Sequence, residues 1–268
     1  MTQVSILIPT YNSGSFLEAA LDHLASQLAP GDEVIIQDNL SSDGTPGVVE
    51  RFDELVSSTV IYRRERDRGQ SDALSRGLAI AKRPWVVWLN ADDRLDRLDL
   101  LRDMAAPEVD VVAGGYQIED ESGRVLRTFP GRVLQLDRLL LRGCYLFSGA
   151  LMFRTSALKA VGGFDPRWQY CMDYDLFLRL AASGVPTVAC NDVTATFRIQ
   201  PQSKTSNAQR KFVQETHELR VRSGRGVVPL RHLYAASATH AVAALLADVR
   251  YTRAYSQART WLRRQGSA

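Results

Sequence analysis

Trp85-Val86-Val87-Trp88-Leu89-Asn90-Ala91-Asp92-Asp93 is the stretch of sequence that decides the fold. Its five apolar residues have the length and composition of a buried strand, and they run directly into an amide and two adjacent carboxylates. Neighbouring acids raise each other's pKa unless a positive charge neutralises them. A divalent metal that also holds a phosphate would do so, because Mg²⁺ and Mn²⁺ prefer hard oxygen ligands. Taken alone, the acid pair is more often a solvated turn, so the rest of the chain has to decide.

Strand-like and helix-like segments alternate along the N-terminal half of the chain. The predicted strands are residues 4–8, 33–37, 59–62 and 84–89, and the predicted helices are residues 15–27, 45–55 and 71–81. This order with short connections predicts an α/β fold with a mostly parallel sheet and helices on both faces. Ligands of such sheets bind at the carboxyl ends of the strands.

Each predicted strand of this half is followed by a polar segment. These segments are residues 9–12, 38–45, 66–72 and 90–93. Any one of them would pass as a turn. Because all four fall on the same edge of the sheet, together they predict a binding site there.

The second half of the chain has a different pattern. We expect antiparallel strands over residues 111–127, a strand at 149–153, a helix beginning near Asp173 and a late strand at 188–198. In that helix Asp175 is the better N-cap by position, which leaves Asp173 free for chemistry. From residue 206 the chain is predicted to be helical and basic, with a break at Gly224 as the best boundary of an appendage.

Composition bounds the class of protein. The 268 residues are 45% apolar and 24% charged, as in ordinary globular proteins. The three scattered cysteines argue against structural zinc and disulfides and suit a reducing cytosol. No signal peptide is expected, and the apolar stretch 233–247 is shorter than the roughly 20 residues of a membrane span. We therefore expect a cytoplasmic protein, with residues 233–247 as a possible homodimer contact.

The charge is divided unevenly along the chain. Residues 204–268 carry 12 basic and 3 acidic side chains, whereas residues 1–203 carry 21 basic and 27 acidic ones. Such a tail favours peripheral contact with an anionic membrane leaflet, and a solvated helical face is the other interpretation. Nucleic acid is not expected, because the tail lacks the interleaved aromatic residues of a stacking platform.

Taken together, the motifs resemble those of the family 2 glycosyltransferases, which are inverting enzymes of the GT-A fold. The resemblance covers roughly residues 3–205. It rests on an ordered set of segments: 4–12, Asp38 with 42–45, 69–74, 90–93, 162–165, and 173–176 with Arg179. It implies a GT-A domain at 1–205, with a nucleotide-sugar-binding half (1–95), an acceptor-binding half (96–205) with a small antiparallel sheet, and a helical appendage (206–268).

The resemblance also implies a ligand set. The donor would be a nucleoside-diphosphate sugar, with uridine or thymidine as the base, and the cofactor would be Mn²⁺ or Mg²⁺. The acceptor would be a hydroxyl of a glycan or lipid-linked glycan in cell-surface polysaccharide or glycolipid assembly.

The position of each residue in these motifs implies its role in the site. Donor contacts are expected from Pro9, Thr10, Tyr11, Asn12, Asp38, Gln70, Asp72, Asn90, Asp92, Arg198 and Lys204. Asp93 would hold the metal, and Asp173 would be the general base. Trp168 and Tyr170 are expected either to stack on an acceptor sugar or to pack in the core. The family often has Asp where this chain has Asn90, and often has His near Gln200.

The chemistry needs these residue types. The leaving diphosphate gains negative charge, which a metal at Asp93 would stabilise. The acceptor hydroxyl loses a proton as it attacks, which Asp173 would accept, and direct attack inverts the anomeric carbon. A sugar-nucleotidyltransferase is the first alternative, although residues 9–14 lack the basic loop typical of that class. A catalytically inactive GT-A-like binding protein is the second, although Asp93 and Asp173 are intact.

Overall fold

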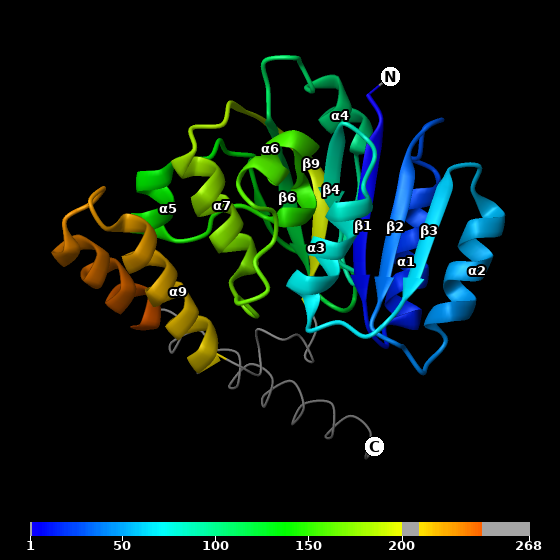
Figure 1. Cartoon of the computed structure of the whole chain (residues 1–268), viewed down its shortest axis with the longest axis horizontal. Coiled ribbons are helices and arrows are strands. Elements are labelled where there is room, and N and C mark those ends of the chain that lie inside the picture. The colour runs from blue at the N-terminus through cyan, green and yellow to red at the C-terminus, as the bar shows by residue number, and fades with distance from the viewer. Residues whose placement is uncertain (1, 200–208, 243–268) are drawn as a thin grey trace, which may run out of the picture.

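The computed structural model describes residues 2–199 and 209–242 of the chain. Within this part, nine strands form one sheet in the order β3-β2-β1-β4-β8-β6-β9-β5, and β7 pairs with β6 (Figure 1). The strands are β1 Val4–Thr10, β2 Glu33–Asp38, β3 Thr59–Arg64, β4 Trp85–Trp88, β5 Arg94–Leu95, β6 Val111–Glu119, β7 Val125–Phe129, β8 Leu151–Arg154 and β9 Thr187–Arg198.

Helices cover both faces of this sheet, as the alternation predicted. They are α1 Gly14–Ala25, α2 Thr45–Leu55, α3 Gln70–Ile80, α4 Leu98–Asp103, α5 Leu136–Arg142, α6 Thr155–Ala160, α7 Met172–Ala182 and α9 Gln209–Gly224, with a short 3₁₀ turn at Ser148–Ala150. Residues 230–242 are also helical. No helix in these described stretches is both long and apolar enough to span a membrane.

The N-terminal half forms the parallel part of the sheet. β3, β2, β1 and β4 lie side by side and run in the same direction. The antiparallel strands expected in the second half are present, but they continue the same sheet instead of forming one of their own. β8 makes the junction, because it is antiparallel to both β4 and β6.

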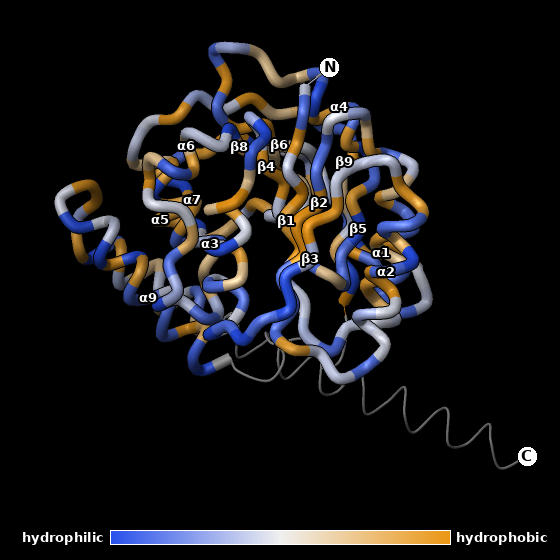
Figure 2. The backbone as a smooth tube through the Cα atoms, turned by 45° about the vertical axis from the view of Figure 1, so that its right-hand side comes forward, coloured by the Kyte–Doolittle hydropathy of each residue, from blue (hydrophilic) through white to orange (hydrophobic). Residues whose placement is uncertain are grey.

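Alternating side chains of the central strands fill two core layers. Leu7 and Ile35 pack with α3 and α7 on one face, whereas Ile6, Val34 and Ile36 pack with α1, α2 and α4 on the other. Burial on both faces explains the continuous apolar runs in these strands. Figure 2 shows these runs in orange at the centre of the molecule.

The C-terminal helices belong to the first of these core layers. Leu219 of α9 and Leu233 of the helix at 230–242 are buried with residues of α5 and α7. Gly224 lies at the corner between the two helices, where a Cβ atom would come within 2.6 Å of Leu233 Cδ2. Gly224 thus permits a close helix–helix turn, and both helices pack on the same core; the predicted division of the chain into domains stays a prediction.

Candidate active site

The carboxyl ends of the parallel strands form one row of polar residues. Thr10, Asp38 and Arg64 are direct neighbours across β1, β2 and β3. The Asp38 carboxylate is buried and accepts hydrogen bonds from the Ser41 backbone N–H at 2.9 Å and from the Tyr62 hydroxyl at 2.6 Å. Asp38 therefore shapes the loop after β2, and its expected contact with the nucleotide base stays a prediction.

The loops after β1 and β2 are fastened together by Asn12. Its backbone adopts a positive φ of 47°, its N–H donates to Ser41 Oγ at 2.8 Å, and its Oδ1 accepts from the Ser42 N–H at 2.9 Å. Next to it, the Tyr11 side chain is 60% exposed. The Thr10 hydroxyl is buried, and no described residue hydrogen-bonds it. At this edge of the sheet the Tyr11 ring is therefore open to a ligand, whereas the Thr10 hydroxyl is covered and Pro9 is half-buried.

The start of α3 contacts residues 90–93, called here the acid motif. Gln70, the first residue of α3, donates from Nε2 to Asn90 Oδ1 at 2.6 Å. Asp72, two residues further on, accepts from the Arg68 backbone N–H at 3.0 Å and from Arg76 Nη2 at 2.9 Å. The Arg68 guanidinium, above all, lowers the pKa of Asp72. The structure thus brings Gln70 to the site, whereas the Asp72 carboxylate is engaged by arginines.

Asn90 organises the two acids that follow β4. Its Oδ1 also accepts from Trp88 Nε1 at 2.7 Å, and its Nδ2 donates to Asp93 Oδ2 at 2.7 Å. The other carboxylate oxygen of Asp93, Oδ1, is buried and has no hydrogen-bond partner among the described residues. A buried, charged carboxylate oxygen without a donor is costly, so this group needs either a proton or a cationic ligand.

The electrostatics of the acid pair agree with that requirement. Burial raises the pKa of Asp93 well above its usual range, the charge of Asp92 raises it further, and Asn90 and Arg198 oppose both effects. The pKa of Asp92 is also raised by burial and lowered by Arg198, whose strand β9 therefore brings a positive charge to the pair. Gln200 and Lys204 lie outside the described residues.

The acid pair fits a divalent metal that is shared with a ligand. Its hard oxygen atoms suit Mg²⁺ or Mn²⁺, and Asp93 Oδ1 is available. Within residues 2–199 and 209–242, no group of three or more His, Cys, Asp or Glu side chains gathers around one point. Among the described residues, Asp93, with Asp92 nearby, would hold such an ion.

Asp173 is the second residue of α7. Its carboxylate accepts from the Tyr174 backbone N–H at 2.7 Å. Burial raises its pKa to about 6, with that N–H as a partial offset. The expectation that Asp175 caps this helix is wrong: Cys171 is the N-cap, and Asp175, the fourth helical residue, pairs with Arg179 at 2.6 Å.

A contact that the sequence did not predict joins the start of α3 to the start of α7. Ser71 Oγ donates to the Trp168 carbonyl oxygen at 2.7 Å and lies 3.2 Å from Met172 Sδ. Gly69, which has a φ of 115°, leaves room for Gln169, because a Cβ atom there would lie 2.6 Å from Gln169 Oε1. Gly69 was the one signal of this contact in the sequence, because a positive φ of this size is rare for residues with a side chain. Through Ser71, the start of α3, which carries Gln70, contacts the segment that leads into α7, the helix of Asp173.

The two aromatic residues differ in their surroundings. Trp168 is 5% exposed and belongs to the core, so its ring is not open to stack on a sugar, and that expected acceptor role is wrong. Tyr170 is half-buried, and Lys211 Nζ lies 6.0 Å from its ring centroid. Tyr170 therefore remains the candidate acceptor contact.

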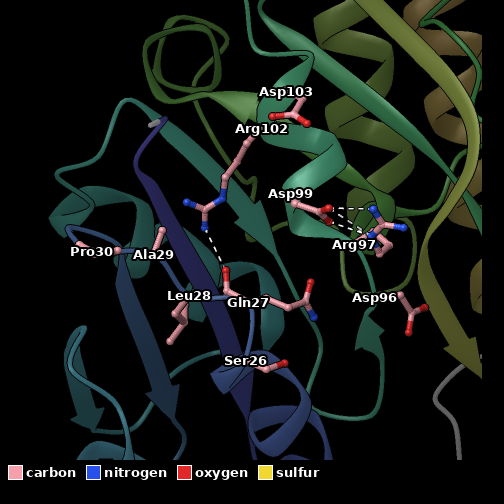
Figure 3. A pocket seen from close by; sticks show the side chains of 10 residues that line it. All are labelled: Ser26, Gln27, Leu28, Ala29, Pro30, Asp96, Arg97, Asp99, Arg102 and Asp103. Carbon is pink, nitrogen blue, oxygen red and sulfur yellow. Dashed lines mark hydrogen bonds and ion pairs between the residues drawn. The ribbon is translucent and has the colours of Figure 1, made fainter.

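A separate pocket of about 490 Å³ lies between the end of α1 and the start of α4 (Figure 3). Its arginines are already paired: Arg97 with Asp99 at 2.8 Å, and Arg102 with the buried Asp32 at 2.5 Å. None of the predicted site residues lines it. The pocket is therefore not the site that the strand ends form.

The sheet and its covering helices form an α/β fold of the GT-A type. The model of glycosyl transferase family 2 matches residues 5–162, more than half of the chain. The chain belongs to this family, and the resemblance and the enzyme class inferred from the sequence are confirmed.

Relatives and solved structures agree with this assignment. A "PGL/p-HBAD biosynthesis glycosyltransferase" of Mycobacterium bovis is 30% identical over 180 residues, which cover 65% of this chain and 68% of the relative. TarS 1–349 of S. aureus with UDP-GlcNAc aligns with a TM-score of 0.65 at 20% identity, over 87% of this chain and 69% of that one. Mannosyltransferase PcManGT from Pyrobaculum calidifontis with GDP-Man and Mn²⁺ aligns with a TM-score of 0.59 at 22% identity, over 96% and 82%. These structural likenesses show the fold.

Proposed function

We propose that the protein transfers a sugar from a nucleoside-diphosphate sugar, UDP- or dTDP-linked, to a hydroxyl of a glycan or lipid-linked glycan, with inversion at the anomeric carbon. The observation that carries the proposal is the unpartnered, buried Oδ1 of Asp93 next to a second carboxylate. A buried carboxylate is neutralised by a proton or by a cation, and a cation at the end of a central strand would be positioned to bind a diphosphate.

The donor would be held at the carboxyl ends of β1, β4 and β9 and at the start of α3. Tyr11 and Thr10 lie at the rim formed by β1, and Gln70 reaches the acid motif from α3. Arg198 adds a positive charge near Asp92 and Asp93. A divalent ion held by Asp93, with Asp92 nearby, would supply the positive charge that stabilises the leaving diphosphate.

Asp173 would remove the proton from the acceptor hydroxyl. A base with a pKa of about 6 is ionised at neutral pH and still accepts a proton readily, which suits general-base catalysis. Because the acceptor attacks the anomeric carbon directly, one displacement occurs and the configuration inverts. The half-buried Tyr170, three residues before Asp173, would contact the acceptor.

A donor panel tests the proposal. UDP-, dTDP- and GDP-sugars are incubated with the protein, with Mn²⁺, with Mg²⁺ and with EDTA, and binding is followed by thermal shift and donor turnover by nucleotide release. We expect a metal-dependent response to UDP- or dTDP-sugars, and NMR of the product should show an inverted anomer. Full turnover in EDTA, or retention of configuration, would contradict the proposal.

We also propose that the C-terminal helices face an anionic membrane surface on its cytoplasmic side. Val227, Leu230 and Tyr234 are each about half exposed there, at 54%, 49% and 53%, and the exposed Arg225 and Arg231 lie among them. Apolar side chains interleaved with arginines suit the interface of an anionic leaflet.

Vesicle co-sedimentation tests this surface. Binding to phosphatidylglycerol vesicles but not to phosphatidylcholine vesicles is expected, and the doubly substituted Arg225→Gln/Arg231→Gln chain should bind less. If the chain is instead a dimer by light scattering and ignores both kinds of vesicle, the surface is a self-association contact.

A further inference from the structure

The segment that precedes α7, the helix of Asp173, is held by Glu215, a residue more than 40 positions further along the chain. Glu215 of α9 accepts three backbone N–H groups: Gln169 at 3.2 Å, and Tyr170 and Cys171 at 2.9 Å each. α9 therefore provides a carboxylate directly before the first turn of α7. Figure 1 shows α9 lying next to α7.

The Glu215 carboxylate binds the backbone that leads into the N-terminus of α7. Cys171 is the N-cap of α7, and its own side chain makes no capping hydrogen bond. A negative charge close to the N-terminus of a helix is favoured by the helix dipole. Glu215 supplies an acceptor for the N-cap residue and for the two residues before it. Asp173 follows two residues later.

α9 makes a second attachment to the same segment. The Cys171 Sγ atom lies 3.4 Å from the Phe212 carbonyl oxygen and 3.2 Å from Thr216 Oγ1. Phe212, Glu215 and Thr216 lie on one face of α9, since they are three and four residues apart. One helical face thus fixes both the backbone and the side chain at the start of α7.

The donor side holds this segment from the opposite direction. Ser71 binds the Trp168 carbonyl oxygen, and Gly69 lies against Gln169. Residues 168–172 are therefore fixed between the start of α3, which carries Gln70, and α9. A shift of this segment would displace Asp173 relative to the donor, and a misplacement of about 1 Å can cost on the order of 100-fold in rate.

We propose that Glu215 is a positioning residue for catalysis, whose carboxylate fixes the backbone of residues 169–171 and so sets the place of Asp173. The inference rests on the proposed role of Asp173 as the base. It makes α9 part of the catalytic apparatus, although α9 lies beyond residues 5–162, which the family model matches. The donor contacts at Gln70 and Asp93 come from other elements, so donor binding does not depend on Glu215.

The test compares Glu215→Ala and Glu215→Gln with Glu218→Gln in the full chain. Glu218 is exposed on the same helix and serves as the matched control. Gln keeps one carbonyl acceptor for the N–H groups but not the charge, so it is the milder change if the Ala variant does not fold. Measured quantities are kcat, KM for donor and acceptor, UDP affinity with Mn²⁺, the unfolding midpoint, and the pH profile of the rate.

We expect kcat to fall at least about tenfold in Glu215→Ala and less in Glu215→Gln, with UDP affinity within about twofold of the unsubstituted chain. The acid limb of the pH profile should also move to lower pH, because a freed segment exposes Asp173 to water. The control should change neither quantity.

An unchanged kcat and pH profile in folded Glu215→Ala would overturn the inference. Equal losses of kcat and UDP affinity with an unmoved pH limb would also overturn it, since they indicate a structural role alone. Asp173→Asn separates this result from the underlying proposal: if that variant remains active, the base assignment has failed, and if only the Glu215 variants remain active, this inference alone has failed.

Discussion

The pKa of Asp173 predicts a pH dependence of the reaction before any rate is measured. Burial raises it from 3.8 to about 6, with the Tyr174 N–H as a partial offset. A general base acts only in its ionised form. Nearly all of the carboxyl is ionised at pH 8, but only about one tenth at pH 5. The rate at saturating donor and metal should therefore fall about tenfold per pH unit below pH 6 and be level above about pH 7.

The same shift predicts the opposite trend in stability. The pKa of Asp173 is higher in the folded chain, about 6, than its ordinary value of 3.8, so the folded state binds the proton more tightly. This contribution to stability is complete below pH 4 and is lost as the pH rises through 6. The loss is on the order of 3 kcal/mol above pH 7, from a shift of roughly two pKa units at about 1.4 kcal/mol each.

The variant Asp173→Asn separates the two trends, because it removes the base and also removes the charge that must be buried. It should lose at least about 100-fold in rate and yet unfold at a higher urea concentration than the unsubstituted chain at pH 8. The difference in stability should shrink as the pH falls toward 4, because the Asp173 carboxyl of the unsubstituted chain is then protonated in the folded state and increasingly protonated in the unfolded state.

The assay combines initial rates of acceptor glycosylation between pH 5 and 8.5 with urea unfolding at pH 4.5 and 8. Saturating donor and metal keep Asp92 and Asp93 occupied, so their titration does not enter the profile. An acid limb centred near pH 4, or an Asp173→Asn chain with nearly full activity, would refute the assignment of the base.

Two further predictions concern the other buried charges. Asp93→Asn should lower the affinity for UDP with Mn²⁺ at least about tenfold in calorimetry without lowering the stability of the ligand-free chain, because the change removes an acid whose pKa burial raises; unchanged affinity would exclude Asp93 as the metal ligand. Arg102→Met should cost about 3–5 kcal/mol in urea unfolding, because it leaves the buried Asp32 without its cation. Adding Asp32→Asn should recover part of that loss, and a cost below about 1 kcal/mol would mean that the ion pair contributes little.

The parallel half of the fold could be predicted because its signals are local. Each strand and helix of residues 4–89 shows its own periodicity, and the direction of the strands follows from short connections. The position of Asp93 is local in the same sense, since it depends only on the end of β4. These parts of the prediction need no information from distant segments.

The acceptor side could not be predicted to the same depth, because contacts distant in sequence determine it. Asp175 has the sequence position of an N-cap, but α7 begins earlier, where Glu215 supplies acceptors from 44 to 46 residues away. Trp168 carries no local sign of burial, yet it packs in the core while Ser71 binds its carbonyl oxygen. A pattern read along the chain contains none of these contacts.

The placement of the proposed base thus depends on two helices, α3 and α9, as well as on the strands of the central sheet. Asn90 contacts Gln70 at the first position of α3, and Ser71 at its second position contacts the segment before α7. α9 holds that segment from its other side through Glu215. Because the same short segment touches the start of α3 and α9, the proposed alignment of donor and base would be fixed jointly by residues 69–71 and by α9. If Asp173 is the base, we expect variation in α9 to alter the acceptor side of the reaction while residues 90–93 after β4 stay unchanged.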